Sequence, residues 1–366
     1  MKQSKRNWKA AAGLLSVCLV FGGCQKLKWR DLDTQAGEFY REGKYQEGAH
    51  VAEQALQIAE TSFGPEDPAL AESYNNLAEI YRALGRETDA EPLFKRAVEA
   101  AEKAHGPSHP DVATALNNLA GLYCDEHRYE EAEVLYRRSL AIRERYLNLT
   151  HPDLGQSLNN LAELYREEGQ YAKAEVFAKR ALSVWNKNPG PVSPAAATAI
   201  NDLGLIYEGQ KRWPEAETSL KEALSLRERT VGSNHPDALQ SAGNLAKLYQ
   251  IEGKLSAAEP LVQQSLEAAR KSLGPEAPGV GEWLDRLGNL RVAQARYADA
   301  ETLYKQSLDL LEKSPGSNQV RMVPVLNDYA QLMHILGKKS QSENLRERAK
   351  MIEALSMAHK NGENKQ

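Results

Sequence analysis

The 366-residue sequence has few cysteines, no excess of one charge and no long apolar run. Its three cysteines, Cys18, Cys24 and Cys124, are too few and too scattered for a disulfide framework or a cysteine-based zinc site. Lys and Arg total 46 against 50 Asp and Glu, so the formal net charge of −4 gives no reason to expect a nucleic-acid partner. At 42% apolar and 26% charged residues, the composition excludes a disordered chain, a collagen-like fibre and a polytopic membrane protein.

The longest apolar run covers only residues 10–21 and follows a basic start that includes Lys5, Arg6 and Lys9. A helix that spans a bilayer needs about 20 apolar residues, so this run is too short to be one. A basic start followed by a short apolar core is typical of a secretory signal. We therefore predict a signal peptide over residues 1–23.

The end of this segment, Gly22-Gly23-Cys24-Gln25, resembles the lipobox of bacterial lipoproteins, although Phe21 stands where that motif usually has leucine. The resemblance implies cleavage before Cys24, lipidation of Cys24 by a palmitate-type acyl chain, and a short lipidated tether over residues 24–30. Gln25 is not the aspartate that resembles an inner-membrane retention signal, which favours the outer membrane. We expect the rest of the chain to face the periplasm.

The rest of the chain repeats with a period of 42 residues. One position, which we interpret as a tight turn, recurs as Gly43, Gly85, His127, Gly169, Lys211, Gly253, Ala295 and Gly337. A proline recurs as Pro68, Pro110, Pro152, Pro194, Pro236 and Pro278, and a glutamate as Glu91, Glu133, Glu175, Glu217, Glu259, Glu301 and Glu343. Such a period predicts a stack of similar structural units.

Within a repeat the apolar residues have helical spacing. Leu116, Leu119, Ala120 and Tyr123 share one face of a helix before the turn, and Ala132 lies on the apolar face of a second helix behind it. Each repeat is therefore a helical hairpin, which can bury its apolar stripe only by stacking on its neighbours. We expect Ala132 and Ala174 to lie where the two helices of a hairpin cross, with no room for a larger side chain.

The pattern of small and large residues at Leu119, Ala120, Tyr123, Ala132 and Tyr136 resembles the tetratricopeptide repeat. The 42-residue period, Asn-Asn-Leu-Ala in the first helix and a His-Pro-Asp start are similar to the repeats of kinesin light chains. The resemblance implies an all-α fold, a right-handed superhelical solenoid of about eight helical hairpins over residues 31–356, followed by a polar tail over 357–366. The coiled coil that precedes these repeats in kinesin light chains is absent from this sequence, which argues against a motor adaptor.

Two recurring polar patterns have structural interpretations. Ser or Thr three residues before the recurring glutamate predicts capping boxes at the start of the second helix, in the pairs Thr88–Glu91, Ser256–Glu259 and Ser340–Glu343. His109, His151 and His235 each precede Pro-Asp and belong to different repeats, which indicates helix starts and no shared metal site.

No phosphate-binding glycine loop, nucleophile elbow, zinc-protease motif or paired catalytic carboxylates can be found, and Cys124 has no recurring His or Cys beside it. We therefore expect a protein that is not an enzyme, with no catalytic residue, no metal, no cofactor and no small-molecule substrate.

Asparagines recur at two neighbouring positions of the first helix, beside its apolar stripe. An amide both donates and accepts hydrogen bonds and can therefore bind an extended peptide backbone. In tetratricopeptide arrays this face lines the concave surface. The predicted peptide-binding groove consists of Asn75, Asn76, Arg82, Asn117, Asn118, Asn159, Asn160, Arg166, Asn201 and Asn244. The alternative is that the asparagines bond between adjacent hairpins and only hold the stack.

These features together predict a non-enzymatic scaffold of the bacterial envelope, anchored by lipid at Cys24, that binds a protein or peptide partner in its groove. Two alternatives remain open. The array could associate with itself as a structural element, or it could position an envelope assembly, pilus, secretion or cell-wall enzyme complex.

Overall fold

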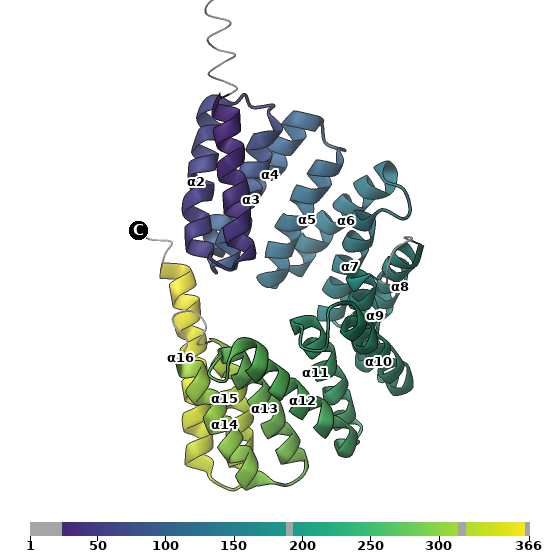
Figure 1. Ribbon diagram of the computed structural model, residues 1–366, viewed down its shortest axis with the longest axis vertical. Helices are drawn as coiled ribbons and strands as arrows, with labels where there is room; N and C mark the ends of the chain where they lie inside the picture. Colours follow the sequence, from purple (N-terminus) through teal and green to yellow (C-terminus); the bar gives the residue numbers. More distant parts are fainter. Residues whose placement is uncertain (1–23, 188–192, 314–319, 363–366) are drawn as a thin grey trace, which may run out of the picture. The chain divides into compact units, whose positions relative to one another are not determined.

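The computed structural model describes residues 24–187, 193–313 and 320–362. The predicted signal peptide, residues 1–23, lies outside this part. The described residues form sixteen α-helices, paired in chain order into eight helical hairpins (Figure 1). This confirms the all-α class and the number of hairpins expected from the period. None of the described helices is both long enough and apolar enough to cross a membrane.

Each hairpin consists of a first helix, which we call the A helix, and a second, the B helix. The A helices are residues 24–41, α3 (Pro68–Ala83), α5 (Pro110–Asp125), α7 (Pro152–Glu167), α9 (Pro194–Gly209), α11 (Pro236–Ile251), α13 (Pro278–Ala293) and α15 (Met322–Ile335). The B helices are α2 (Tyr45–Ser62), α4 (Glu87–His105), α6 (Tyr129–Tyr146), α8 (Tyr171–Lys187), α10 (Trp213–Thr230), α12 (Leu255–Leu273), α14 (Tyr297–Glu312) and α16 (Lys339–Gly362).

The recurring proline is the first residue of six A helices, where its missing N–H costs nothing because that group has no partner within the helix. In five of the six the side chain of the preceding residue caps the helix, and the exception is Ala277 before α13. The Nδ1 atoms of His109, His151 and His235 accept hydrogen bonds from the backbone N–H groups two residues on, at 3.2 Å. Ser193 caps α9 through its hydroxyl in the same way. The His-Pro-Asp motif is therefore a helix start, as predicted.

The turn between the A and B helices has the same backbone conformation in all eight hairpins. Its φ angle lies between 57° and 74°, including at His127, Lys211 and Ala295. This left-handed conformation is unfavourable for residues with a Cβ, which explains why five of the eight positions are glycine.

A small residue stands where the B helix meets the A helix of its own hairpin. Ala132 and Ala174 are completely buried, as are their equivalents Ala90, Ala216, Ala258 and Ala300. Complete burial agrees with the expectation for Ala132 and Ala174, while the lack of room for a larger side chain stays a prediction.

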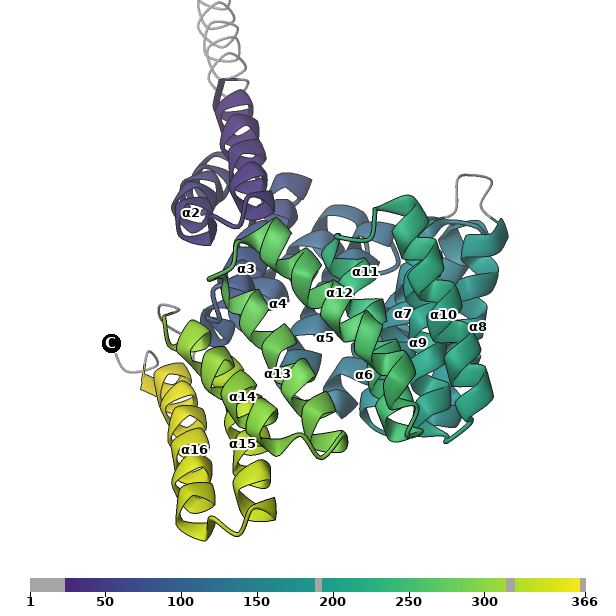
Figure 2. The same cartoon turned by 60° about the horizontal axis from the view of Figure 1, so that its bottom comes forward.

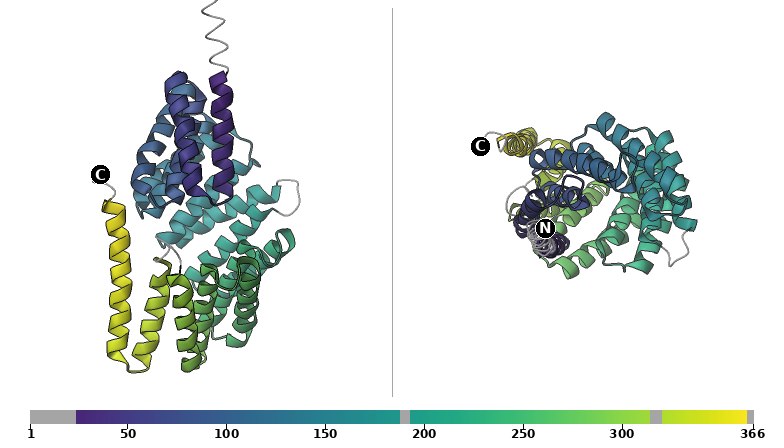
Figure 3. Two further views of the ribbon diagram at one scale, coloured as in Figure 1. Left: turned by 60° about the vertical axis from the view of Figure 1, so that its left-hand side comes forward. Right: turned by 90° about the horizontal axis from the view of Figure 1, so that it is seen from above.

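The helices form two compact units that meet in sequence at Asn148 and Leu149. The first contains the helix 24–41 and α2–α6, and the second contains α7–α16. Within the second unit, successive helices from α11 to α16 lie side by side (Figures 1 and 2), and α16 packs on α15 at its end (Figure 3).

The segment 24–30, which the sequence analysis assigns to a tether, is the first part of the helix 24–41. Trp29 in this segment is 5% exposed, and its indole N–H donates to Ser73 Oγ at 2.7 Å. Its ring packs edge-on against Phe63, and Lys26 pairs with Asp67 at 2.9 Å. The segment is therefore packed on the second hairpin, while Cys24 is exposed.

The predicted capping boxes are wrong. The B helices α4 and α12 begin at Glu87 and Leu255, so Thr88 and Ser256 lie inside the first turn, and the capping residues Arg86 and Lys254 make no side-chain cap hydrogen bond. In the third hairpin with this pattern, α16 already begins at Lys339, ahead of Ser340.

The recurring glutamate instead joins one hairpin to the next. Glu91 accepts hydrogen bonds from the hydroxyl of Tyr123 at 3.0 Å and from Arg128 at 3.1 Å. Glu217 accepts from Tyr249 and Lys254, which occupy the same positions three repeats later. The glutamate therefore stabilises the stack between neighbouring hairpins.

Candidate peptide-binding face

The predicted groove asparagines lie on the A helices at two neighbouring positions. We call the position of Asn75 the first ladder position and the position of Asn76 the second. The first is occupied by Asn75, Asn117, Asn159 and Asn201, and the second by Asn76, Asn118, Asn160 and Asn244.

Hydrogen bonds join these positions from one hairpin to the next. In the first unit, Asn118 Nδ2 donates to Asn75 Oδ1 at 2.8 Å, and Asn76 Nδ2 donates to Asp33 Oδ1 at 2.8 Å. In the second unit, Asn244 Nδ2 donates to Asn201 Oδ1 at 3.1 Å. In each pair the second position donates to the first position of the preceding hairpin, and we call this set of bonds the asparagine ladder.

The ladder corresponds to the alternative in which the asparagines hold the stack. Asn159 and Asn201 are only 6% and 3% exposed, so a ligand could not reach their side chains. Burial therefore removes these two from the candidate ligand contacts, because their amides lie in the layer between hairpins. The other six ladder asparagines are half-buried.

The ladder bond uses only half of each amide in the Asn75–Asn118 pair, where the Oδ1 of Asn75 and the Nδ2 of Asn118 bond to each other. The Nδ2 of Asn75 and the Oδ1 of Asn118 remain, as one donor and one acceptor, to meet the C=O and N–H groups of an extended peptide. Stack formation and ligand binding are therefore compatible at this pair.

The two arginines of the predicted groove already have acidic partners. Arg82 on α3 pairs with Asp125 on α5 at 2.6 Å and lies 3.7 Å from Glu79. Arg166 lies 3.4 Å from Glu167 and 3.8 Å from Glu163, both on its own helix. Arg82 therefore links two A helices, and its charge is largely compensated before any ligand arrives.

Each unit has a pocket over its A helices. In the first unit a pocket of about 570 Å³ lies over the helix 24–41, α3 and α5 and is lined by Asn76, Glu79 and Asn118 together with Tyr40 and Arg41. In the second unit a pocket of about 580 Å³ lies over α11, α13 and α15. Its polar wall consists of Lys247, Gln250, Glu282, Asp285, Arg286, Asn289 and Arg321.

Aspartates replace asparagine at two ladder positions of the second unit. Asp202 has the second position of α9, and Asp285 the first position of α13. Burial raises the pKa of both to about 7, with a further contribution from the negative charges of Glu163 and Asp328 respectively. Asn159 occupies the first ladder position of the hairpin before Asp202, where a ladder bond would be expected. Its buried Oδ1 has no hydrogen-bond partner among the described residues. From the sequence, Asp285 indicates only that the asparagine is lost at its ladder position. Asp202 was not noticed, although the period shows its place at the second ladder position.

One cluster of possible metal ligands occurs in the described part of the chain, formed by His105, His109 and Asp111 at the corner between α4 and α5. His109 recurs as His151 and His235 and is therefore visible in the repeat pattern, whereas His105 is replaced by Leu147 and Val231 at the equivalent positions.

Solved structures with this architecture include proteins of different functions. The nearly identical repeats of a protein described as a kinesin light chain from Podosopora anserina are 25% identical to this chain, with a TM-score of 0.50, and cover 56% of this chain and 97% of that one. The apo form of the quorum sensor NprR from B. thuringiensis is 15% identical with a TM-score of 0.69, covering 96% and 93%. A Rap protein in complex with competence and sporulation factor is 16% identical with a TM-score of 0.57, covering 90% and 98%. No curated protein matches the chain.

The family model for the tetratricopeptide repeat matches over residues 32–103, 70–145, 111–187, 194–271 and 247–313. These matches cover most of the described hairpins. Members of this family are typically scaffolds that bind proteins or peptides rather than enzymes. The chain belongs to the tetratricopeptide repeat family.

Proposed function

We propose that this chain is a lipid-anchored scaffold of the bacterial envelope that holds an extended segment of a partner protein against its A helices. The observation that carries the binding role is the half-used amide pair Asn75–Asn118. The acceptor of Asn118 lies at the first-unit pocket, and the donor of Asn75 lies at a second pocket of about 340 Å³ that shares Asn76 with the first. The anchor rests on the lipobox-like sequence before Cys24, which is exposed at the start of the described chain.

The charge of the pocket wall defines the chemistry of a suitable segment. Glu79 and Arg41 line the first-unit pocket, and the Arg82 side chain beside it is engaged by Asp125. A wall of mixed charge favours a polar, uncharged or mixed segment, held through its backbone. The Rap protein, which shares this fold, was crystallised with a bound factor, and such binding is compatible with the arrangement proposed here.

The experiment uses a substitution that separates ligand binding from stacking. Asn75→Asp keeps the oxygen that accepts from Asn118, as Asp33 does for Asn76, but removes the Nδ2 donor. Peptides selected on the full-length chain from a random library would serve as probes, with affinities measured by fluorescence anisotropy. Loss of one neutral hydrogen bond costs about 0.5–1.5 kcal/mol, so N75D should weaken binding about two- to tenfold without lowering the melting temperature.

Two controls complete the design. Asn118→Asp removes the ladder donor and should lower the melting temperature, because the acceptor on Asn75 loses its partner. Val134→Ala alters an exposed B-helix position, 67% exposed, and should change neither property. A chain that selects no peptide, or an N75D chain that binds its peptides as tightly as the wild type, would contradict the proposal.

A further inference from the structure

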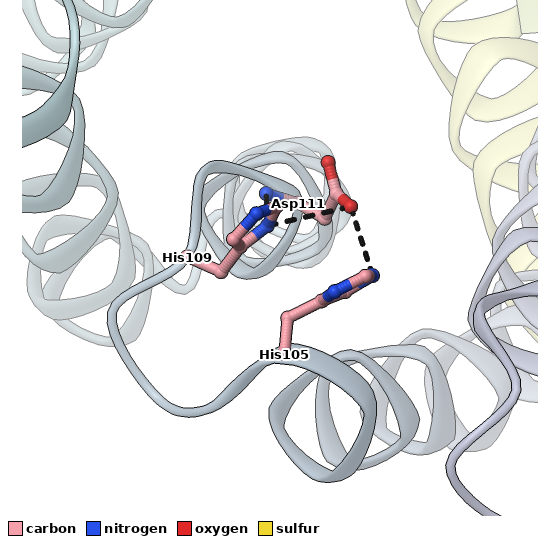
Figure 4. Close-up of side chains that lie close together, drawn as sticks. All are labelled: His105, His109 and Asp111. Carbon is pink, nitrogen blue, oxygen red and sulfur yellow. Dashed lines mark hydrogen bonds and ion pairs between the residues drawn. The ribbon is translucent and has the colours of Figure 1, made fainter.

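Two imidazoles and a carboxylate meet at the corner between α4 and α5. Asp111 Oδ2 lies 3.1 Å from His105 Nε2 and 3.4 Å from His109 Nδ1 (Figure 4). The two imidazole rings are stacked, with centroids 4.3 Å apart and planes 19° from parallel. One ligand atom from each residue can be chosen so that all three lie within 4.8 Å of one another.

These separations are close to those of a metal site. Zinc binds imidazole nitrogen and carboxylate oxygen at about 2.0–2.2 Å, so two ligand atoms of a tetrahedral site lie about 3.4 Å apart. The two distances to Asp111 are close to this separation. The two nitrogens must also approach each other. Because an imidazole nitrogen binds a metal in the plane of its ring, metal binding requires the His105 ring to turn out of its stacked arrangement with His109.

The cluster borders a pocket that carries additional negative charge. This pocket of about 340 Å³ is lined by Glu72, Asn75, His105, Asp111 and Thr114, with Asn76 and four apolar side chains. Burial raises the pKa of Glu72, and the nearby carboxylates of Asp33 and Asp111 raise it further. A divalent cation bound at Asp111 would relieve this repulsion, and its remaining coordination position would face the pocket.

The other repeats show that helix capping does not require this cluster. His151 and His235 cap their helices with the same geometry as His109. However, Leu147 and Val231 occupy the positions equivalent to His105 in those repeats. The second imidazole is thus an addition to the cap, present at this corner and absent from the otherwise equivalent ones.

We propose that His105, His109 and Asp111 bind one divalent transition-metal ion of the Zn²⁺ class, with a fourth position open to the pocket. Two imidazoles and one carboxylate suit zinc better than magnesium or calcium, which prefer oxygen ligands. Ligation through His109 Nδ1 replaces the hydrogen bond that this atom accepts from the Asp111 N–H. The neutral His109 ring then carries its proton on Nε2.

The test measures zinc bound by the full-length chain, purified in detergent and stripped of metal with a chelator. After equilibrium dialysis against Zn²⁺, elemental analysis should find one zinc per chain. A Cys124→Ser background keeps that thiol from contributing. Cobalt(II) provides a second readout, because its visible absorption reports nitrogen and oxygen ligands in a tetrahedral site.

The repeats supply matched variants. His105→Leu introduces the residue found at Leu147, and His109→Ser introduces the cap found at Ser193, so both should preserve the fold while weakening zinc binding by about tenfold or more. His235→Ser makes the same cap exchange at a corner without a second imidazole and should bind zinc like the wild type. Melting curves from circular dichroism confirm that each variant is folded. A wild-type chain that binds no zinc, or H105L binding as tightly as the wild type, would overturn the proposal.

Discussion

The side-chain amide of Asn118 donates to the side-chain oxygen of Asn75 across 2.8 Å, and the two residues are 43 positions apart, one more than the repeat period. The same offset separates Asn244 from Asn201 and Asn76 from Asp33. Each ladder bond therefore runs from the second position of one hairpin to the first position of the hairpin before it. The chemistry of both positions must be complementary, because one supplies the hydrogen and the other the lone pair.

Asp202 breaks this complementarity. At the second ladder position it has no N–H to donate, and Asn159, 43 residues earlier, has a buried Oδ1 without a partner among the described residues. Burial, reinforced by Glu163, raises the pKa of Asp202 to about 7, against the opposing effects of Arg166, Asn201 and Arg227. The folded chain therefore retains a proton at this carboxyl that the unfolded chain releases near pH 4.

This arrangement predicts a stability that falls as pH rises from about 4 to 7, since the unfolded chain binds fewer protons in that interval. Asp202→Asn should flatten the decline and, by giving a buried acceptor its donor, raise the free energy of unfolding at pH 8 by about 1–3 kcal/mol. Melting temperatures of wild type and D202N between pH 5 and 8 provide the measurement. Asp31→Asn, at an exposed position, serves as control. Parallel pH profiles for wild type and D202N would refute the role of this carboxyl.

The fold could be predicted in detail because its determinants are local. The proline at the first helical position, the left-handed turn and the apolar spacing each act within a few residues, so a 42-residue period reveals them directly. The contacts between hairpins could not be predicted in this way. The spacing paired Glu91 with Thr88 in a capping box, whereas its partners Tyr123 and Arg128 are 32 and 37 residues away.

In the candidate site, too, the features local to one repeat could be predicted and the contacts between hairpins could not. Comparing equivalent positions placed the asparagines on the A helices correctly, but the ladder bonds join positions that are not equivalent. The buried state of Asn159 and Asn201 depends on neighbouring helices, and no residue type within the repeat indicates it. His105 could not be predicted for a similar reason. It lies beside His109 at the turn from α4 to α5, and among the described residues only this turn has a second histidine at that position.

The crossing of α5 and α6 predicts a large cost for a bigger side chain. Ala132 is completely buried, and overpacking a tightly packed site typically costs about 1–3 kcal/mol. Ala132→Leu should therefore lower the melting temperature by several degrees, as followed by circular dichroism. Val134→Leu, on the exposed side of the same helix, should leave it unchanged. Equal melting of A132L and wild type would mean that the register of the hairpin is incorrect.

The proposed anchor predicts the consequence of removing one thiol. With Cys24→Ala, the chain should retain residues 1–23 and should no longer incorporate radioactive palmitate, because the acyl chain is expected on the Cys24 sulfur. Cys124→Ala, at the other cysteine of the described chain, should be labelled like the wild type. Gel mobility and autoradiography measure processing and labelling together. Palmitate labelling that persists in C24A would exclude Cys24 as the lipidated residue.

The turn between α9 and α10 predicts a stabilising substitution. Lys211 has a φ of 59°, in the left-handed region that costs a residue with a Cβ about 1–2 kcal/mol, and its side chain is exposed. Lys211→Gly removes this strain, while the greater freedom of glycine in the unfolded chain offsets about 0.4–1 kcal/mol. The free energy of unfolding should therefore rise by about 0.5–1 kcal/mol, measured by urea denaturation. The reverse exchange provides the control, since Gly253 has a φ of 73° and open space around its Cβ position. Gly253→Lys should lower the free energy of unfolding by a similar amount through the backbone alone. A K211G chain no more stable than the wild type, together with an unaffected G253K chain, would show that the left-handed turn does not determine the preference for glycine.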